Sequence, residues 1–567
     1  MNLLSVILDW HSSQSDLIVQ EEYFSYGPIS LHVQRTNIGD KQLKNFVFNK
    51  EQGILCGVIG YISNIADLRK KLIGGGNRDD VELLAELYLK EGESSFSLIE
   101  GFFTVFIWDF TRQKGYIFQD ENGFQTPLLY ISTQGKSLFC NSLRILLKSG
   151  EFPRKLNLQA ARDFLYSRVI IPNESTLIEG VCKLLPGQII IIDWKAKSMK
   201  VQTIRRNEIR FSSDDAKKNL IASIEEETKK LSALAGTSDI GTALSSGFDT
   251  NLILFFLNKQ YFKKIVAVTI GGKKVNEISS ASCCAATYEK VRHVAAVVED
   301  SRLLDFPDIV WRSEGSIFES GLFLANELGK VLQKETISVV FLGDGADQQL
   351  NPFRLTEGAV KSLIKQFKHR LKQKIIPLRK FWRLLKHKKI YVSKYPLAIH
   401  KLKKPMQLFV YDTKKDYILK KCGVILNSYG IQPLYPFLSR KTLALAKSLS
   451  PGECRRKKFY RKEVKKILAS TVSQYLRKIG GATDIEYLCQ DKKSLFEELL
   501  HKDLIKTILP MLDDKQKKEM LEDIPSYTES LAHLLYIYLF NELFISGKYD
   551  SLFNNTGINL TLGDFFD

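Results

Sequence analysis

A serine-rich turn between a predicted strand and a predicted helix is the first segment whose residues could do chemistry. Residues 239–250 read DIGTALSSGFDT and run directly into the apolar stretch NLILFFLN. A strand that ends in Ser-Ser-Gly-x-Asp-Thr and opens a helix would bring hydroxyl groups, free backbone N–H groups and a positive helix end together, which suits pyrophosphate. Asp249 would add a hard oxygen ligand for Mg²⁺. A plain turn after a strand is the alternative interpretation.

A second acidic turn follows another apolar run. Residues 337–349 read ISVVFLGDGADQQ, a buried-strand pattern that ends in a Gly-Asp-Gly-Ala-Asp loop. Because the carboxyl ends of parallel strands lie along one rim of a sheet, Asp347 can meet Asp249 around a common ligand. Two such loops after two such strands would be an odd coincidence for plain turns. We therefore predict a nucleotide site in which Asp249 and Asp347 bind the metal.

The elements that must position these loops have the pattern of a parallel α/β unit. From Ser212 onward, SSDDAKKNLIASIEEETKKLSAL places serines ahead of a long amphipathic helix with acids in its first turn. Strand-like and helix-like runs then alternate up to the second acidic loop, which is typical of a parallel sheet. Beyond residue 353 the pattern is almost purely helical to about residue 545. Polar residues within 531–545 indicate a core helix rather than a membrane span.

The first 200 residues predict a separate, β-rich domain. Short runs rich in Val, Ile, Phe and Tyr, such as GFFTVFIWDF and GQIIIIDW, are separated by Gly, Asn or Lys. Helical spacing of apolar residues appears at 78–90 and at 158–167. We place the domain boundary near Asn207, so that the domains span 1–206 and 207–567.

Composition excludes several classes of protein. The chain has 567 residues, of which 44% are hydrophobic and 26% charged, so disordered and fibrous classes are excluded. The N-terminal residues show no basic region and no small-residue cleavage site, and the eight cysteines show no zinc spacing. We therefore expect a cytoplasmic protein with reduced thiols.

One segment carries most of the net charge of +19. Residues 361–404 hold 16 of the 82 Lys and Arg residues and no acid, which leaves 66 basic against 63 acidic residues elsewhere. This pattern argues against a protein that coats nucleic acid and favours a local patch with its own role. A solvated helical surface is the alternative interpretation.

Both loops resemble motifs of the asparagine synthetase family, whose synthetase domain carries an SGGxDS pyrophosphate loop and a GEGADE loop. Here they read SSGFDT at 245–250 and GDGADQ at 343–348. The resemblance covers most of the chain and includes EGFF and WD within 100–109 (RGMFAFALWD in the family), QDENGFQTPL at 119–128 (RDRFGIKPL), LLPG at 184–187 (LPPG), YPFL at 435–438 (VPFLD) and KFYRKE at 458–463 (KxLLRE). It implies an α/β protein with an N-terminal Ntn-hydrolase-like αββα sandwich and a C-terminal parallel-sheet PP-loop ATP pyrophosphatase domain with a large helical part.

The resemblance also implies roles for individual residues. Asp344 stands where asparagine synthetases carry glutamate, and an acid there would help to deprotonate an incoming amine. Lys478, in LRKIGG, matches a lysine that stabilises the acyl-transfer state, and Glu314 resembles a glutamate on the substrate side. ATP and pyrophosphate would be bound by Leu244, Ser245, Ser246, Gly247, Phe248, Asp249, Thr250, Gly343 and Arg461.

The N-terminal domain departs from the glutamine-using members of the family. Those members begin, after removal of Met, with a cysteine nucleophile, whereas this chain reads Met1-Asn2-Leu3 and has no cysteine before Cys56. The family's glutamine-holding NGEIYN reads IGYISN at 59–64, which lacks both the amide and the carboxylate. Because an N-terminal nucleophile also uses its own α-amine as base, we predict a glutamine amidotransferase-like domain without glutaminase activity.

The pyrophosphate loop departs from the family as well. Ser246 replaces a glycine, which would strain the backbone if this position required a positive φ. Thr250 replaces a serine and keeps the hydroxyl group. We interpret the loop as diverged but working, and a catalytically dead protein is the alternative.

The implied activity is ATP-dependent amide formation, in which ATP adenylates a substrate carboxylate with release of pyrophosphate and an amine then displaces AMP. Without glutaminase activity, the amine must come from another source. β-Lactam synthetases and lasso peptide cyclases also lack this activity, and they use an amine of the substrate. Chain length and the acid Asp344, where β-lactam synthetases carry tyrosine, favour macrolactam (isopeptide) formation in a precursor peptide for antibiotic biosynthesis. The alternatives are an amidotransferase that uses ammonia or a small amine, including β-lactam ring closure, and an inactive binding protein that uses the basic face.

The expected cofactors are therefore ATP and Mg²⁺. The expected partner is a precursor peptide that the segment 361–404 would guide, with a leader peptidase or a leader-binding protein as further candidates. No membrane or nucleic-acid partner is expected.

Overall fold

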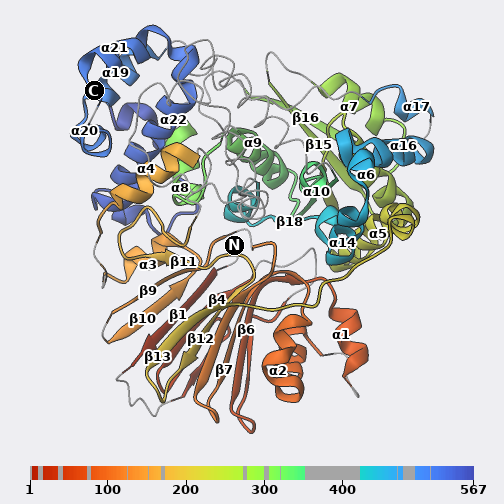
Figure 1. Cartoon of the computed structure of the whole chain (residues 1–567), viewed down its shortest axis with the longest axis horizontal. Coiled ribbons are helices and arrows are strands. Elements are labelled where there is room, and N and C mark those ends of the chain that lie inside the picture. Colours follow the sequence, from red (N-terminus) through yellow and green to blue (C-terminus); the bar gives the residue numbers. More distant parts are fainter. Residues whose placement is uncertain are drawn as a thin grey trace, which may run out of the picture.

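The computed structural model places two antiparallel sheets next to a parallel sheet and a large group of helices (Figure 1). It describes residues 3–10, 17–35, 43–72, 78–123, 126–133, 135–150, 152, 154–167, 173–272, 277–298, 305–319, 321–350, 422–468, 470–476, 492–510 and 512–566. The basic segment 361–404 and Lys478 lie outside the described residues, as do Asn2 and the rest of 477–491.

The N-terminal part forms a sandwich of two antiparallel sheets. The seven-stranded sheet has the order β11 (Cys182–Lys183), β9 (Leu129–Ser132), β10 (Lys136–Cys140), β1 (Leu3–Asp9), β4 (Ile29–Gln34), β3 (Tyr23–Tyr26), β2 (Ile18–Val19). The six-stranded sheet has the order β13 (Ser198–Thr203), β12 (Gln188–Asp193), β8 (Lys114–Gln119), β7 (Gly101–Asp109), β6 (Ile54–Ile62), β5 (Phe46–Asn49).

Helices cover the outer faces of this sandwich. Every residue of β6 is buried, because its inner face packs on the seven-stranded sheet and its outer face packs under α1 (Ile65–Lys71) and α2 (Asp80–Glu91). The outer face of β9 and β10 packs against α3 (Leu143–Lys148), α4 (Leu158–Ser167) and C-terminal helices. The predicted αββα arrangement and the predicted helices at 78–90 and 158–167 are confirmed.

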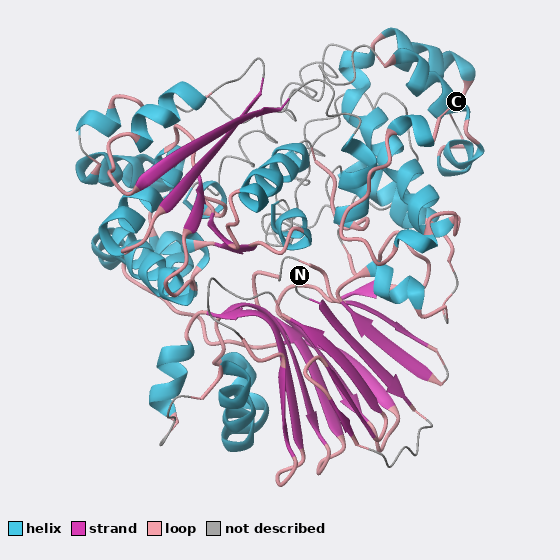
Figure 2. Cartoon of the chain, turned by 180° about the vertical axis from the view of Figure 1, so that it is seen from behind, coloured by secondary structure: helices cyan, strands magenta, loops and turns pink. Residues whose placement is uncertain are grey.

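The C-terminal part contains a five-stranded parallel sheet (Figure 2). Its order is β16 (Val291–Val298), β15 (Ile265–Gly272), β14 (Ile240–Ala243), β17 (Val339–Phe341), β18 (Gln432–Leu434). The chain first builds outward from β14 to β16 and then returns to the other side of β14 through β17. Ligands bind where the strand order reverses in this way, at the carboxyl ends of the two strands on either side of the crevice. Here those strands are β14 and β17.

Helices surround this sheet and form the rest of the domain. The predicted helix after Ser212 is α5 (Ser213–Leu234), and the Ser212 hydroxyl accepts a hydrogen bond from the Asp215 amide at 3.0 Å, as the capping pattern indicates. The other helices near the sheet are α6 (Phe248–Gln260), α7 (Ile278–Ala285), α9 (Gly321–Lys334), α10 (Ala346–Leu350), α14 (Arg440–Ser448), α15 (Pro451–Cys454), α16 (Lys458–Ile467) and α17 (Ser470–Ser473). The helix α8 (Phe306–Ser313) packs in the core of the C-terminal helices instead.

The C-terminal helices form a second hydrophobic core. They are α19 (Lys493–His501), α20 (Asp503–Ile508), α21 (Asp514–Glu522) and α22 (Ile524–Phe540), which continues as one π-helical turn over Asn541–Ile545. The stretch 531–545 is a core helix, as predicted. The almost purely helical interpretation of the region after 353 missed β18, because three residues with a central proline give no strand signal of their own. Among the described helices, none has the length and apolar character needed to cross a membrane.

Residues 204–212 connect β13 to α5 and so join the two parts of the chain. The expected boundary at Asn207 lies in this connection and stays a prediction.

Candidate active site

The loop between β14 and α6 is held by its own side chains. The Thr250 hydroxyl accepts a hydrogen bond from the Ser245 amide at 3.1 Å and lies 3.0 Å from the Ser245 hydroxyl, which in turn accepts from the Gly247 amide at 3.1 Å. Leu244, the first residue of the predicted set, is buried, and its amide donates to the Val268 carbonyl of β15. The loop therefore has a fixed shape at the N-terminus of a 13-residue helix.

Asn251 is a positioning residue that the sequence did not reveal. Its side-chain amide is fully buried and donates to the carbonyls of Ser245 at 2.9 Å and Gly247 at 2.7 Å. These bonds tie the loop to the first turn of α6. Ser246 is also fully buried, and it is absent from the described non-glycine residues with positive φ, so the strain considered for the glycine replacement is not present.

The second acidic loop packs directly against the first. A Cβ atom on Gly343 would meet the Thr250 methyl group at 3.0 Å, so the two loops touch at this glycine. Gly345 has a φ of +93°, and a Cβ atom there would lie 2.5 Å from Leu438. A side chain at either glycine would crowd this contact, and the φ of Gly345 also favours glycine.

Lys457 joins the two predicted metal ligands. Its ammonium lies 2.6 Å from Asp249 Oδ2 and 2.8 Å from Asp347 Oδ1, and its side chain is 3% exposed. Arg456 and Lys457 both have positive φ, at 52° and 55°. Two consecutive non-glycine residues in this region store strain, and such strain clusters at functional sites. The structure therefore brings Asp249 and Asp347 together, as the sequence predicted, around a lysine that it did not predict.

A signal for Lys457 was present in the sequence. It directly precedes the KFYRKE stretch that resembles the family's KxLLRE helix, and it is the residue four before Arg461. An alignment shifted by one residue would have selected it. Its burial could not be read from a run of four basic residues, 455–458, which is typical of a solvated surface.

The two carboxylates fit a magnesium ion that is bound together with a nucleotide. Asp249 Oδ1 is buried and has no hydrogen-bond partner, which leaves an oxygen lone pair available to a cation. No group of three or more His, Cys, Asp or Glu side chains that could hold a metal occurs among the described residues. Mg²⁺ commonly takes one or two carboxylates and completes its shell with phosphate oxygens and water. When bound here, it would neutralise charge on the phosphates.

Two further predicted residues near this cluster are Arg461 and Asp344. The Arg461 guanidinium lies over the Phe248 ring at 5.6 Å, at the start of α6. Asp344 is half-buried in the second loop, and burial, with the charge of Asp344 as a further cause, raises the pKa of Tyr435 well above its usual value. Burial and the charge of Asp249 likewise raise the pKa of Tyr460.

Glu314 lies elsewhere, at the contact between the two parts of the chain. Its carboxylate accepts hydrogen bonds from the Ser142 hydroxyl at 2.9 Å, the Leu143 amide at 2.5 Å and Arg144 Nε at 2.7 Å. These groups come from the N-terminus of α3, so the described partners of Glu314 belong to the sandwich. A substrate role for Glu314 stays a prediction.

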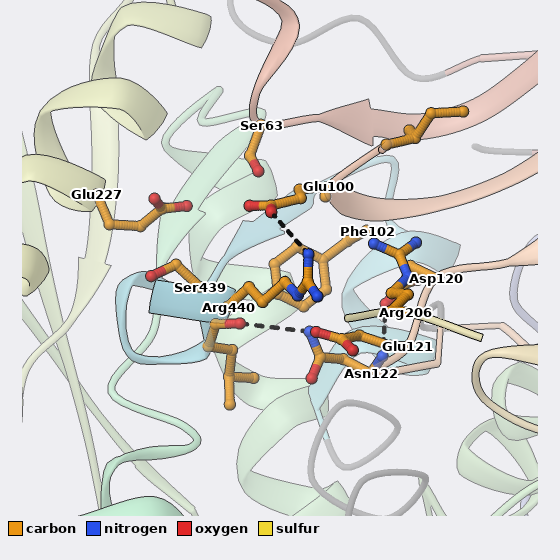
Figure 3. A pocket seen from close by; sticks show the side chains of 13 residues that line it. Ser63, Glu100, Phe102, Asp120, Glu121, Asn122, Arg206, Glu227, Ser439 and Arg440 are labelled. Carbon is orange, nitrogen blue, oxygen red and sulfur yellow. Dashed lines mark hydrogen bonds and ion pairs between the residues drawn. The ribbon is translucent and has the colours of Figure 1, made fainter. Parts of the chain in front are cut away.

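A second contact between the parts of the chain lines a small, partly open pocket (Figure 3). Arg440 reaches from α14 to Glu100 at 3.7 Å, and the Asn122 amide donates to the Leu438 carbonyl at 3.3 Å. Burial raises the pKa of Glu227 on α5 to about 7 and that of Asp120 to about 7. The pocket therefore holds carboxyl groups that titrate near neutral pH.

The predicted glutamine-holding positions are apolar in the structure. Ile59 and Tyr61 of β6 are buried at 0% and 1% exposure, and Cys56 on the same strand is fully buried. Burial raises the pKa of the Cys56 thiol, which disfavours the nucleophilic thiolate. Arg35 and Asp80 form a bidentate ion pair beside this strand, at 2.9 and 2.7 Å.

Comparison with known proteins places these features in a family. A model of the glutamine amidotransferase domain matches residues 20–203, and a model described as asparagine synthase matches residues 232–530, more than half of the chain. The chain belongs to the asparagine synthase family. The predicted membership is confirmed, whereas the lasso cyclase branch stays a prediction.

Curated relatives of this family member are distant. It is 22% identical over 313 residues to "Asparagine synthetase [glutamine-hydrolyzing] 1" of Bacillus subtilis, covering 52% of this chain and 47% of the relative. It is 26% identical over 144 residues to "Asparagine synthetase [glutamine-hydrolyzing] 2" of the same organism, covering 25% of this chain and 19% of the relative. The chain thus spans about half the length of the first relative and less of the second.

A solved glutamine phosphoribosylpyrophosphate amidotransferase from B. subtilis is similar at 12% identity, with a TM-score of 0.24 over 52% of this chain and 75% of that chain. This likeness is too low to bear on function.

Proposed function

We propose that the protein is an ATP-dependent ligase that forms a carbon–nitrogen bond, with release of AMP and pyrophosphate. The observation that carries this proposal is the Asp249–Lys457–Asp347 cluster at the carboxyl ends of β14 and β17. Family membership supports it, since the asparagine synthase model covers both loops. In the proposed reaction a substrate carboxylate attacks the α-phosphorus of ATP, and an amine then displaces AMP from the acyl-adenylate.

Each group of the site has a task in this reaction. The loop from Ser245 to Thr250 and the first turn of α6 would bind the pyrophosphate through backbone N–H groups and hydroxyls. Lys457 would offset phosphate charge, and Arg461 lies close enough to Phe248 and the helix start to join it. Asp344 would accept a proton from the amine. Lys478, outside the described residues, would stabilise the oxyanion of acyl transfer.

We further propose that glutamine does not supply the amine. Where the family's glutamine-holding motif would provide an amide and a carboxylate, β6 presents the buried side chains of Ile59 and Tyr61. Incubation with glutamine should release no glutamate above a blank without enzyme. Measurable glutamine hydrolysis would overturn this part of the proposal.

The proposed substrate is a precursor peptide whose own amine closes a macrolactam (isopeptide) ring, as in lasso peptide cyclases. A substrate that carries its own amine is consistent with a sandwich without glutaminase features, and the basic segment 361–404 would attract an acidic peptide. A leader peptidase or a leader-binding protein would act on the same peptide, and the reaction would take place in the cytoplasm.

Two measurements test this proposal, one for adenylation and one for cyclisation. Exchange of labelled pyrophosphate into ATP, driven by a carboxylate substrate, tests adenylation. Mass spectrometry of a candidate peptide tests cyclisation, because ring closure removes one water. Exchange with small carboxylates and ammonia, but not with peptides, would favour the amidotransferase alternative, which the asparagine synthetase relatives support. Absence of exchange with every carboxylate would favour an inactive binding protein.

The role of the basic segment has its own test. Reversing the charges of Lys386, Lys388, Lys389 and Lys401 should raise KM for an acidic peptide, flatten the salt dependence of KM and spare kcat, because salt screens such charges beyond roughly 8–10 Å. An unchanged KM at low salt would show that the segment is a solvated surface and would remove the main support for a peptide substrate.

A further inference from the structure

Two charged side chains, Glu277 and Lys457, make contacts within the proposed nucleotide site that a bound nucleotide and its metal would also make. The Glu277 carboxylate accepts a hydrogen bond from the Ser246 amide of the pyrophosphate loop at 2.8 Å. The Lys457 ammonium lies between Asp249 Oδ2 and Asp347 Oδ1, so a metal that took the place between these two oxygens would have to displace it. We propose that Glu277 stands in for a phosphate of the nucleotide and Lys457 for its metal, so that Mg²⁺-ATP binds by displacing both. This inference rests on the proposed ATP-dependent function.

The argument for Glu277 starts from the donors of the loop. The Ser245 and Gly247 amides donate to hydroxyl groups within the loop, whereas the Ser246 amide donates to a carboxylate from the N-cap of α7, outside it. Carboxylate and phosphate oxygens compete for the same N–H donors, and both are attracted to the positive end of α6. Glu277 therefore holds an anion-binding donor that a bound phosphate would take.

The argument for Lys457 is electrostatic. One ammonium already neutralises part of the charge of two carboxylates at 2.6 and 2.8 Å, and a divalent ion in the same place would be repelled by it. Mg²⁺ without nucleotide should therefore bind weakly to this site. The phosphates of ATP give the displaced ammonium a new anionic partner, so metal and nucleotide should bind together.

The first experiment measures binding of a non-hydrolysable ATP analogue with Mg²⁺ by calorimetry. Glu277→Gln should bind the analogue about tenfold more tightly than the parent, the scale of one charge-assisted hydrogen bond that no longer has to be broken. Glu289→Gln is the matched control, because Glu289 is exposed just beyond α7 and its removal changes the net charge equally. Equal or weaker binding by Glu277→Gln would overturn the role of Glu277 and assign it to loop positioning.

The second experiment measures binding of Mn²⁺, as a paramagnetic probe, by electron paramagnetic resonance. The parent protein should bind no Mn²⁺ tightly alone and about one per chain when the ATP analogue is present. Lys457→Gln should bind Mn²⁺ without nucleotide, and should be stabilised by it in thermal unfolding. Tight binding of Mn²⁺ to the nucleotide-free parent would overturn the role of Lys457, and this result does not depend on whether the variant folds.

The same titrations separate this inference from the function it rests on. Failure of the parent and all variants to bind the analogue with Mg²⁺ would overturn the ATP-dependent function together with the inference. Binding of equal strength by the parent, Glu277→Gln and Glu289→Gln would overturn the inference alone and leave the function standing.

Discussion

The buried ammonium of Lys457 neutralises two carboxylates that would otherwise repel each other at the end of the sheet. Asp249 and Asp347 come from loops almost a hundred residues apart in the chain, and Lys457 comes from a third segment. Removing one member of such a buried group leaves charge uncompensated, which typically costs about 3–5 kcal/mol. The same three side chains therefore matter for stability and for the proposed catalysis, and variants must be assayed for both.

The acids Asp249 and Asp347 should be indispensable for adenylation. Asp249→Asn and Asp347→Asn should each lower pyrophosphate exchange by about 10²-fold or more, because each removes a ligand for Mg²⁺. Asp214→Asn, on the exposed side of α5, is the control and should exchange normally. Exchange within a few-fold of the parent in either site variant, with normal thermal unfolding, would mean that other residues bind the metal.

Glu314 should act as a positioning residue between the two parts of the chain. Its pair with Arg144 is 14% and 6% exposed, so Glu314→Gln and Arg144→Met should each lower the free energy of unfolding by about 1–3 kcal/mol, and the double variant should lose less than the sum. Urea unfolding measures this coupling. A raised KM for the carboxylate substrate with unchanged unfolding would instead support the substrate role that the sequence suggested.

At the scale of elements, short connections at the carboxyl ends of β14 and β17 decide the geometry of the site. The turn before α10 strongly favours glycine, since Gly345 combines a φ of +93° with close contact to Leu438. The strained turn at Arg456 and Lys457 begins α16 and directs Lys457 inward. Strained backbone conformations of this kind cluster at functional sites.

Gly345→Ala should therefore displace the second acidic loop. We expect a loss of stability of about 2 kcal/mol or more and a clear loss of nucleotide affinity, because the methyl group demands a different φ and a shift of Leu438. Gly452→Ala, in α15, is the control, since a Cβ atom there meets nothing within 4 Å. Calorimetric binding and urea unfolding test both variants, and a Gly345→Ala protein that binds like the control would show that the loop is adaptable.

At the scale of the whole molecule, the sandwich and the synthase-like part meet through polar contacts as well as apolar ones. The Arg144–Glu314 pair lies at this interface. The pocket around Glu100 and Arg440 lies there too (Figure 3). In the pocket, Glu227 is only 7% exposed and is surrounded by Lys230, Glu100, Glu226 and Asp67 as its main charged neighbours. Burial favours its neutral form, so the interface should respond to pH.

Stability should fall as pH rises through neutrality because of Glu227. Its pKa is raised from 4.5 to about 7 in the folded protein, so the folded state binds more protons than the unfolded state between these values. The contribution is fully present below about pH 4.5 and is lost as pH passes 7, with a size of up to about 3 kcal/mol. Glu227→Gln should flatten this decline between pH 5 and 8 in urea unfolding.

Glu226→Gln is the matched control for this prediction. Glu226 is the preceding residue of α5, and a hydrogen bond from Lys441 lowers its pKa. Its removal should leave the decline between pH 5 and 8 in place. A Glu227→Gln protein with the parent's pH dependence would show that Asp120 or Glu100 dominates the titration of the interface.

The sequence by itself determined the family, the β-rich and α/β parts and the two acidic loops. Each of these depends on residues that are close together in the chain. The β-rich N-terminal part, the helix after Ser212 and the strand–loop–helix around Asp249 follow from period and turn chemistry, whereas the αββα arrangement was implied by the resemblance to the family. The meeting of Asp249 and Asp347 also followed, since parallel strands share one rim.

Only the tertiary structure decided which side chains from distant parts of the chain contact the two acidic loops at the carboxyl ends of the strands. Lys457 lies in a basic run that looks solvated, yet a strained turn buries it between the two acids. Glu277 reaches the Ser246 amide from another helix, and Glu314 faces α3. Such contacts depend on how elements dock, and the docking is set by the packing of whole faces rather than by local sequence. For that reason the chemistry of the loops could be predicted from the sequence, and their counter-charges could not.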